Sequence, residues 1–257
     1  MKTIVVLIAF LFAMPVFSVE YQTNSKIGEL FSKAKVEGTV VVFDVQSSSY
    51  IAYNPARAEM RYVPASTFKI ANSLIGLSVG AINDVDEILP YGDSPQPIKK
   101  WEKDMGLRDA IKISNVPVFQ ELARRIGLER MRQNIRKLNY GNNNMGNVVD
   151  SFWLEGPLKI SAIEQTNFLA RLAQGKLPFP DRSQASVREI IKLEEGKDWI
   201  LYGKTGWSKN IGWWVGWVVK NGSIYSFALN IDMPDIKDAP KRIELGKNSL
   251  KALGILD

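Results

Sequence analysis

Apolar residues form short runs at both ends of the chain, which is the pattern of strands that are partly or fully buried. The predicted strands are residues 39–45, 50–53, 198–207, 212–219 and 223–233. A polar turn joins the first two, and an Asn-Gly pair, Asn221 and Gly222, joins the last two. Asn-Gly between two apolar runs is the strongest local signal of a β-hairpin, so the last two strands are expected to be antiparallel neighbours.

In the middle of the chain, apolar residues instead recur every three or four positions, which predicts helices. The predicted helices are residues 107–114, 117–126, 128–138, 161–174 and 183–193, with a last one at residues 239–253. Ser161 and Glu164 form a capping box, and Pro117 suits a first helical turn. This order predicts an α+β fold, an α/β sandwich in which helices flank an antiparallel sheet of N- and C-terminal strands. A helical subdomain is inserted between those strands, and the cleft between the two parts is the expected site.

The first 18 residues have the pattern of a secretory signal peptide. Lys2 precedes an uncharged apolar run over residues 4–17, and Val16 and Ser18 suit cleavage after residue 18. An uncleaved membrane anchor is the weaker alternative, because the run is short for a span with flanks. We therefore expect a signal peptide at residues 1–18 and a single catalytic domain at residues 19–257, with no membrane attachment. A Gram-negative periplasm is the expected location, and secretion from a Gram-positive cell is the alternative.

The amino-acid composition limits the catalytic groups that the chain can use. The chain has 257 residues, 46% of them apolar, and contains no cysteine, so packing alone must stabilise an ample core. It also contains no histidine, which excludes a Ser-His-Asp triad and nearly all catalytic zinc sites. A base must then be lysine, tyrosine or a carboxylate. The basic run at residues 121–141 is interrupted by Glu121 and Glu129, so a solvated helix face, and no nucleic-acid binding, is predicted.

A serine and a lysine three residues apart, Ser66 and Lys69, follow Pro64 in the segment PASTFK. If a helix begins at Pro64 or Ala65, the hydroxyl and the amine lie on one face, as a nucleophile and its base would. The same spacing in SKAK, residues 32–35, belongs to an ordinary amphipathic helix, so the spacing alone is weak. Apolar neighbours surround only the first lysine: Phe68, Ile70, Ala71, Leu74 and Ile75. We therefore expect a buried amine at Lys69.

Two further segments carry candidate chemistry. Lys204, Thr205 and Gly206 supply a cation, a hydroxyl and a close backbone approach, as a carboxylate site needs, although a strand ending in a turn is an equal alternative. Ser114 either relays a proton beside the nucleophile or caps the helix that starts at Pro117.

These segments occur in the order Ser-x-x-Lys, Ser-x-Val, Tyr-Gly-Asn (residues 140–142) and Lys-Thr-Gly. Together with VDSFWLEGPLKIS and IGWWVGWV, they make the chain resemble the class D (oxacillinase, OXA-type) serine β-lactamases over essentially its whole mature length. Ser-x-Val replaces the Ser-Asp-Asn of class A enzymes, and no class A-type glutamate motif is found, which favours class D.

The resemblance implies a fold like that of serine β-lactamases and penicillin-binding transpeptidases. It implies hydrolysis of the β-lactam amide bond of penicillins, oxacillin-type, and of some cephalosporins, and hence antibiotic resistance. Ser66 would be the acylated nucleophile. Lys69, carboxylated by CO2 or bicarbonate, would be the general base, and Ser114 would relay the proton. No metal or organic cofactor is implied.

The resemblance also assigns the remaining site residues. Trp153 would donate to the carbamate, while Phe68, Val116 and Leu154 keep its surroundings apolar. Lys204, Thr205 and Arg242 would hold the substrate carboxylate, with Lys241 as an alternative to the arginine. The backbone amides of Ser66 and Trp207 would stabilise the oxyanion, Gly206 belongs to the substrate-binding set, and Trp101 would line the cleft mouth.

Physical chemistry supports a carbamate at a buried lysine. An apolar pocket lowers the pKa of an amine, and the neutral form is the one that attacks CO2. The product is an anion and requires a donor inside the pocket. The short connection at residues 208–211 adds a hypothesis of good penicillin hydrolysis and weak carbapenem hydrolysis.

Three alternatives share these motifs. A penicillin-sensitive transpeptidase or carboxypeptidase would release β-lactams slowly and usually has extra domains or an anchor. A β-lactam sensor domain would bind β-lactams without turnover, and such domains are attached to transmembrane segments. A structural protein with accidental motifs is the third. The expected partners are β-lactam antibiotics, and the chain is expected to be a monomer or a homodimer.

Overall fold

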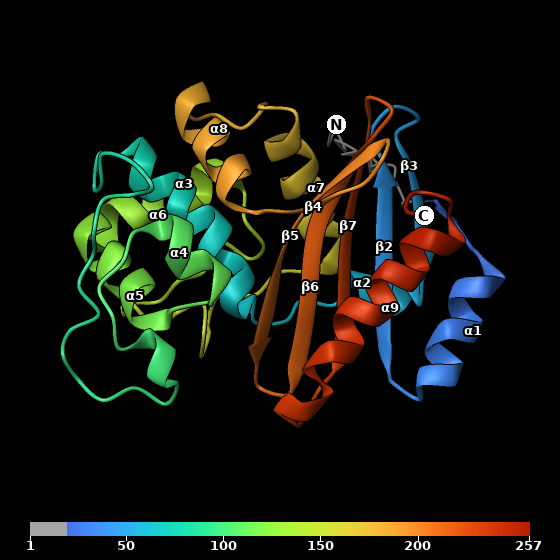
Figure 1. Cartoon of the computed structure of the whole chain (residues 1–257), viewed down its shortest axis with the longest axis horizontal. Coiled ribbons are helices and arrows are strands. Elements are labelled where there is room, and N and C mark those ends of the chain that lie inside the picture. The colour runs from blue at the N-terminus through green and yellow to red at the C-terminus, as the bar shows by residue number, and fades with distance from the viewer. Residues whose placement is uncertain (1–19) are drawn as a thin grey trace, which may run out of the picture.

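The computed structural model describes residues 20–257, and the expected signal peptide at residues 1–18 lies outside that range. Within it, the strands are β1 (Tyr21–Gln22), β2 (Gly38–Asp44), β3 (Ser49–Tyr53), β4 (Lys192–Glu195), β5 (Trp199–Ser208), β6 (Ile211–Lys220) and β7 (Ser223–Asp232). They form one sheet in the order β1-β3-β2-β7-β6-β5-β4 (Figure 1). N- and C-terminal strands meet where β2 pairs with β7. All pairs are antiparallel except the short β1, which runs parallel to β3, so the predicted sheet is confirmed with a mixed edge.

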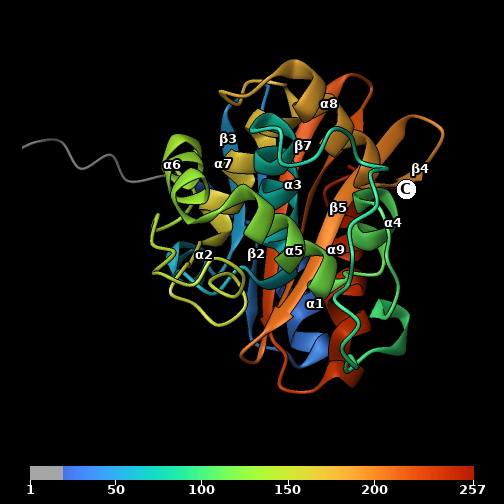
Figure 2. The same ribbon diagram turned by 90° about the vertical axis from the view of Figure 1, so that its left-hand side faces the viewer.

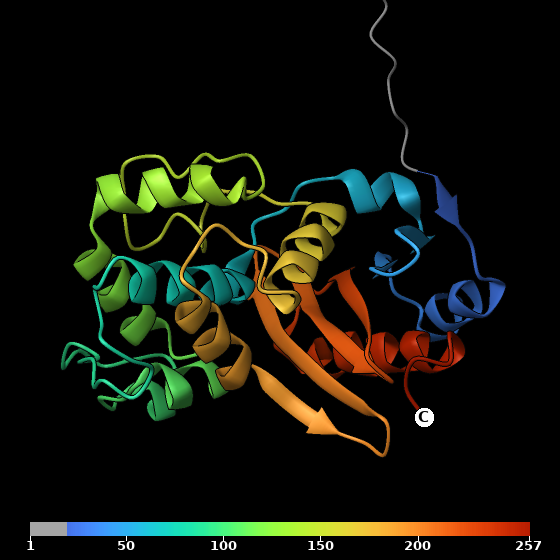
Figure 3. The ribbon, with the colours of Figure 1, turned by 90° about the horizontal axis from the view of Figure 1, so that it is seen from above.

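Helices cover both faces of this sheet. They are α1 (Ser25–Ala34), α2 (Pro55–Glu59), α3 (Lys69–Ser78), α4 (Leu107–Lys112), α5 (Val116–Ile126), α6 (Leu128–Leu138), α7 (Ala162–Ala173), α8 (Asp181–Ile190) and α9 (Ala239–Ala252). Short 3-10 turns are η1 (Ala65–Phe68), η2 (Lys99–Trp101) and η3 (Ile236–Asp238). Seen from above, α1 and α9 lie on one face and α7 on the other (Figure 3). Helices α3 to α6 form the inserted helical part beside the sheet (Figure 1), and they face the viewer in Figure 2, as expected for an α+β fold.

Local sequence explains most element boundaries. The capping box predicted at Ser161 and Glu164 is present at the start of α7. The turn between β6 and β7 places Asn221 and Gly222 at positive φ, 49° and 82°, as a two-residue hairpin requires.

One predicted element needs correction, and one strand was missed. The helix predicted at residues 183–193 ends at Ile190, and the following Lys192–Glu195 form the edge strand β4. Pairing with β5 outweighs the helical propensity of this charged segment. The missed strand is β1: it has only two residues, too few for a visible apolar alternation.

The sheet separates two cores. In β6, Trp213, Val215 and Trp217 face the core shared with α3, α5 and α7, whereas Trp214 and Val218 face the core under α1 and α9. Helix α3 enters the first core and is buried along nearly its whole length. Its first residue, Lys69, is therefore carried into the protein interior. Among residues 20–257, no helix has the length and apolar composition that a membrane crossing requires.

Candidate active site

The predicted nucleophile and base are in contact. Ser66 lies in the 3-10 turn η1 that leads directly into α3, and Lys69 is the first residue of that helix. The Lys69 Nζ donates a hydrogen bond of 2.8 Å to the Ser66 Oγ. Lys69 is fully buried, whereas Ser32 and Lys35, which have the same spacing in SKAK, are exposed at the end of α1. The expectation from their apolar and polar neighbours is thus confirmed.

The surroundings of Lys69 are aromatic. Its Nζ lies 5.3 Å from the centre of the Phe119 ring, and Phe68, the residue before it, stacks on Trp153 at 5.6 Å. Burial lowers the pKa of Lys69 well below its ordinary value, and the nearby Lys204 cation lowers it further. Burial therefore favours the neutral amine over the ammonium form of Lys69. A neutral amine held against a hydroxyl is able to accept its proton.

Trp153 presents an unpaired donor in this interior. Its side chain is fully buried, and its Nε1 has no hydrogen-bond partner among residues 20–257. A buried donor without a partner is costly, so this N–H suits an acceptor that arrives in the pocket. The backbone oxygen of Trp153 accepts from the Ala65 N–H at 2.9 Å, which ties this segment to the nucleophile turn. The residues present thus fit an anion formed on Lys69.

Buried polar side chains hold the nucleophile turn in place. The Thr67 hydroxyl donates to the Pro64 oxygen at 2.7 Å and accepts from the Gln165 Nε2 at 2.8 Å. The Trp213 Nε1 donates to the Val63 oxygen at 2.9 Å. These contacts fix a backbone in which Ala65 adopts a positive φ of 51°, a strained conformation for alanine.

Sequence reasoning did not single out Gln165 or Trp213. Each is an ordinary member of an apolar stripe or strand, and no local signal marks its contact with the distant nucleophile turn. The Tyr-Gly-Asn motif likewise proves to be a brace. Tyr140 is buried beside Gln165, and Asn142 accepts from the Lys159 N–H at 3.0 Å and donates to the Pro157 oxygen at 3.0 Å.

Ser114 and Lys204 also come together. The Lys204 Nζ donates to the Ser114 Oγ and, at 3.0 Å, to the Thr205 oxygen. Asn115, not Ser114, caps α5, because its side chain accepts from the Val118 N–H. The capping alternative for Ser114 is therefore wrong. Ser114 adopts a positive φ of 56°, a strained conformation of the kind that is common at functional sites.

Burial lowers the pKa of Lys204 to about 7, and the neighbouring Arg242 cation contributes to the same shift. Arg242 itself is buried on α9, and burial lowers its pKa to about 10. Its Nη1 donates to the Gly206 oxygen at 2.7 Å, while its Nε lacks a partner within residues 20–257. Lys241 instead forms an ion pair with Asp238 at 3.0 Å. Of the two candidate cations, only Arg242 contacts the Lys-Thr-Gly strand.

The nucleophile turn packs closely on one face of strand β5. A Cβ atom on Gly206 would lie 2.9 Å from the Pro64 oxygen, so only glycine permits this approach. The Gly203 N–H donates outward, to Ile191 beyond the strand edge. Because backbone direction alternates along a strand, the Trp207 N–H points to the same edge. Strand β4 pairs with β5 only up to Tyr202, so at Trp207 this edge is not covered by β4, as a donor to an oxyanion requires.

Three other predicted residues lie on the neighbouring elements. Trp101 is partly exposed, and its Nε1 donates to the Ile113 oxygen at 3.0 Å, next to Ser114. It therefore braces the segment that carries Ser114. Val116 starts α5 and is half-buried. The Trp207 ring is 40% exposed and donates to the Met233 oxygen.

Lys204 and Arg242 are the cationic side chains of the site. Neither forms an ion pair with a carboxylate in the part of the chain that the structure describes. The same range holds no cluster of three or more carboxylate side chains suited to a metal. Buried cations without counter-ions favour an anionic ligand. The arrangement thus brings together the residues predicted as nucleophile, base and carboxylate-binding cations.

Comparison with known proteins agrees with this geometry. A family model described as the penicillin-binding protein transpeptidase domain matches residues 38–251. Beta-lactamase OXA-5 of Pseudomonas aeruginosa is 39% identical over 264 aligned residues, which cover 100% of this chain and 99% of that protein. Beta-lactamase OXA-48 of Klebsiella pneumoniae is 39% identical and covers 96% of this chain and 95% of its own length.

Among solved structures, FUS-1 (OXA-85), a class D β-lactamase of Fusobacterium nucleatum subsp. polymorphum, superimposes with a TM-score of 0.89. It is 45% identical, and the match covers 92% of this chain and 100% of that one. The class D β-lactamase YbXI of Nostoc gives a TM-score of 0.87 at 39% identity, covering 90% and 99% of the two chains.

Proposed function

The chain belongs to the class D serine β-lactamases, and from this we propose that it hydrolyses the β-lactam amide bond through an acyl-enzyme on Ser66. The substrates are penicillins of the oxacillin type and some cephalosporins, and their destruction confers antibiotic resistance. The observation that carries the proposal is the 2.8 Å contact between the Ser66 hydroxyl and the Lys69 amine, which is fully buried and whose pKa is lowered by that burial. A lysine with a lowered pKa beside a hydroxyl is suited to react with CO2 and to serve as the base.

In acylation, the Ser66 Oγ attacks the β-lactam carbonyl carbon as its proton passes to Lys69. The backbone N–H groups of Ser66 and Trp207 stabilise the oxyanion that develops. When the ring C–N bond breaks, Lys69 passes the proton that it took from Ser66 to the ring nitrogen through Ser114, whose Oγ contacts Lys204. Water then attacks the ester as Lys69 accepts its proton, and Lys69 returns that proton to the Ser66 Oγ, which leaves as the alcohol.

Lys69 is proposed to act in its carboxylated form. The carbamate, formed from CO2 or bicarbonate, supplies an anionic general base for both steps. The buried Trp153 Nε1, which lacks another partner among residues 20–257, would donate to it. Phe68 and Phe119 exclude bulk water from the same pocket. The proposal involves no metal and no organic cofactor.

Substrate binding depends on charge. Lys204, with the Thr205 hydroxyl, and Arg242 would hold the carboxylate that penicillins and cephalosporins share. Arg242 reaches β5 from α9 and retains an unpaired Nε, while Lys204 is directed toward Ser114. A bound carboxylate would raise the pKa of Lys204 from about 7 and keep it charged. Bound substrate would thus favour the protonated form of Lys204.

The turn between β5 and β6 supports a narrow substrate range. It consists of Lys209 and Asn210, both at positive φ, and is therefore a minimal two-residue hairpin. We propose good penicillin hydrolysis and weak carbapenem hydrolysis, since no longer loop closes over the mouth. Imipenem turnover comparable to that of ampicillin would contradict this part. A periplasmic location after removal of residues 1–18 belongs to the same proposal.

The experiment is steady-state hydrolysis of ampicillin by residues 19–257, supplied with bicarbonate, beside Ser66→Ala and Lys69→Ala. Wild-type protein is expected to turn over many equivalents, and Ser66→Ala none. Intact-mass spectrometry of Lys69→Ala should show, at most, one penicilloyl group that is retained. A wild-type protein that stops after one equivalent would instead be a β-lactam sensor or a penicillin-binding transpeptidase.

A further inference from the structure

A buried glutamine on a distant helix bonds to the nucleophile turn. Gln165 lies on α7, and its Nε2 donates a hydrogen bond of 2.8 Å to the Thr67 Oγ1. The same hydroxyl donates its proton to the Pro64 oxygen at 2.7 Å. Because a hydroxyl has one proton, the Thr67 oxygen is able only to accept on the side of Gln165. The direction of donation is therefore fixed, from Gln165 to Thr67 and from Thr67 to Pro64.

The other end of the glutamine amide is held as well. The buried Tyr140 hydroxyl donates to the Gln165 Oε1 at 3.5 Å. An amide whose oxygen accepts from Tyr140 presents its nitrogen to Thr67. The backbone is anchored by the capping box that opens α7 at Ser161. A directed chain of side chains thus reaches the nucleophile turn from α7.

Thr67 determines how closely the nucleophile turn approaches β5. A Cβ atom on Gly206 would lie 3.1 Å from the Thr67 Cγ2 and 2.9 Å from the Pro64 oxygen, so both groups rest on this strand. The next residue of β5 is Trp207, whose N–H is one proposed oxyanion donor. The residue before Thr67 is Ser66, whose N–H is the other. The separation of these two N–H groups therefore depends on how Thr67 sits against β5.

The turn requires an outside constraint to keep this geometry. Ala65 has a positive φ of 51°, which an alanine keeps only where its surroundings impose it. If the Thr67 hydroxyl loses its partner on α7, the backbone at Ala65 is free to relax toward an ordinary conformation. The N–H of Ser66, the next residue, then moves with it.

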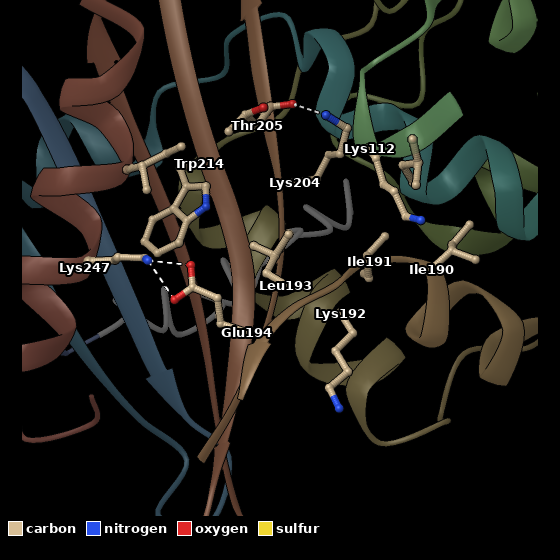
Figure 4. Close-up of a pocket in the computed structure, with 13 residues that line it drawn as sticks. Lys112, Ile190, Ile191, Lys192, Leu193, Glu194, Lys204, Thr205, Trp214 and Lys247 are labelled. Carbon is tan, nitrogen blue, oxygen red and sulfur yellow. Dashed lines mark hydrogen bonds and ion pairs between the residues drawn. The ribbon is translucent and has the colours of Figure 1, made fainter. Parts of the chain in front are cut away.

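The carboxylate site is held by separate contacts. The Lys204 Nζ donates to the Thr205 oxygen on β5, as Figure 4 shows, and to the Ser114 Oγ. Neither bond involves the nucleophile turn. A disturbed turn should therefore slow acyl transfer without weakening the binding of the substrate.

We propose that Gln165 is a positioning residue for the oxyanion site. It acts through the Thr67 hydroxyl and does not touch the substrate. The inference rests on the proposed function, because it requires acyl transfer at Ser66. Acylation and deacylation both form an oxyanion at this site, so both steps depend on Gln165.

The test is single-turnover acylation by a chromogenic cephalosporin at saturating bicarbonate. Gln165→Leu removes both polar ends of the amide at similar volume. We expect the limiting rate to fall about tenfold, less than the roughly 100-fold cost of deleting an oxyanion donor. The substrate concentration that gives half of this rate should change by less than about twofold.

The matched control is Gln184→Leu. Gln184 is equally buried, but its Nε2 donates to the backbone oxygens of Leu177 and Phe179 rather than to the nucleophile turn. Both substitutions should lower Tm, because each leaves buried polar groups without partners. Only Gln165→Leu should lower the limiting acylation rate of the folded protein.

Gln165→Glu gives a second readout within one variant. Burial favours the neutral carboxylic acid, whose O–H donates to Thr67 as the amide does, whereas a carboxylate only accepts. The acylation rate relative to wild type should therefore rise from about pH 8 to about pH 5.5, and the ratio for Gln165→Leu should stay flat. Burial raises the pKa of Tyr140, and Glu164 is paired with Arg61, so neither neighbour changes charge in this range. Comparison with wild type at each pH removes the titration of Lys204.

The outcomes separate the inference from the proposed function. An unchanged limiting rate in Gln165→Leu, an equal fall in Gln184→Leu, or a flat ratio for Gln165→Glu would overturn the inference while hydrolysis through Ser66 stands. The pH dependence of Gln165→Glu decides the matter even if Gln165→Leu does not fold. A wild-type chain that is not acylated would overturn the proposed function and the inference together.

Discussion

Replacing Trp153 by phenylalanine isolates the role of one buried N–H group. Phenylalanine keeps an aromatic ring against Phe68 and Phe152, which contact the tryptophan at centroid distances of 5.6 and 5.0 Å. It removes the Nε1 donor that has no other partner within residues 20–257. The substitution therefore tests the donor rather than the packing, which alanine would also disrupt.

The magnitude follows from the hydrogen bond that is lost. A hydrogen bond to a charged group contributes about 1.5–3 kcal/mol, and each 1.4 kcal/mol is a tenfold change in an equilibrium constant. The equilibrium constant for carboxylation of Lys69 should fall about 10- to 150-fold. The bicarbonate concentration that gives half-maximal turnover should rise by the same factor. Acylation by the first equivalent should be less affected than release of the acyl group.

The assay is ampicillin hydrolysis across a bicarbonate titration, with ¹³C NMR of protein equilibrated with labelled bicarbonate to detect the carbamate. Trp217→Phe is the matched control, because Trp217 is also buried and stacks on Tyr202 rather than on a residue next to Lys69. It should lose stability without a shift in bicarbonate dependence. Full turnover by Trp153→Phe in bicarbonate-free buffer would refute the reasoning.

Three further predictions concern other parts of the site. Burial holds the pKa of Lys204 at about 7 in the folded protein, below the ordinary 10.5. Between these two pH values the unfolded chain binds more protons than the folded protein, so the free energy of unfolding should rise with pH in this range. Lys204→Met should flatten that rise by up to about 1.4 kcal/mol per pH unit in urea titrations from pH 7.5 to 9.5, and an unchanged slope would contradict the assigned shift. Gly206→Ala should lower kcat/KM at least about tenfold, because its Cβ would lie 2.9 Å from a backbone oxygen of the nucleophile turn. Gly28→Ala, whose Cβ meets nothing closer than 3.7 Å, is the control, and equal activity of the two variants would exclude this reasoning. Ser208 donates to the Leu154 oxygen and ties the hairpin to the segment that carries Trp153, so Ser208→Ala should raise the bicarbonate requirement about fivefold, the effect of roughly 1 kcal/mol. A titration curve identical to wild type would show that this tether does not position the pocket.

Patterns along the chain were sufficient to predict the five longer strands of the sheet and the buried lysine. The apolar runs at the two ends of the chain predicted strands that pair in the structure, because the alternation of side chains determines both register and burial. The apolar neighbours of Lys69 predicted that its side chain is buried, and its burial in α3 confirms that prediction. The exposed Lys35, with the same spacing from a serine, shows that the spacing alone carries little.

Contacts between segments that are distant in the sequence could not be predicted from local patterns. Nothing local distinguishes Ser114 from Asn115 as a helix cap, since both are good capping residues and only the positive φ of Ser114 separates them. Trp213 contacts Val63 across 150 positions, and Gln165 contacts Thr67 across 98. The strand at β4 depends on a partner that the sequence of that segment does not reveal.

The most direct test of the account is a progress curve for a chromogenic cephalosporin with the purified mature protein, recorded with and without bicarbonate and beside Lys69→Ala. We expect many turnovers that accelerate with bicarbonate in the wild type, and no turnover in the variant. A single stoichiometric burst in the wild type, unchanged by bicarbonate, would contradict hydrolysis through Ser66 and a carboxylated Lys69.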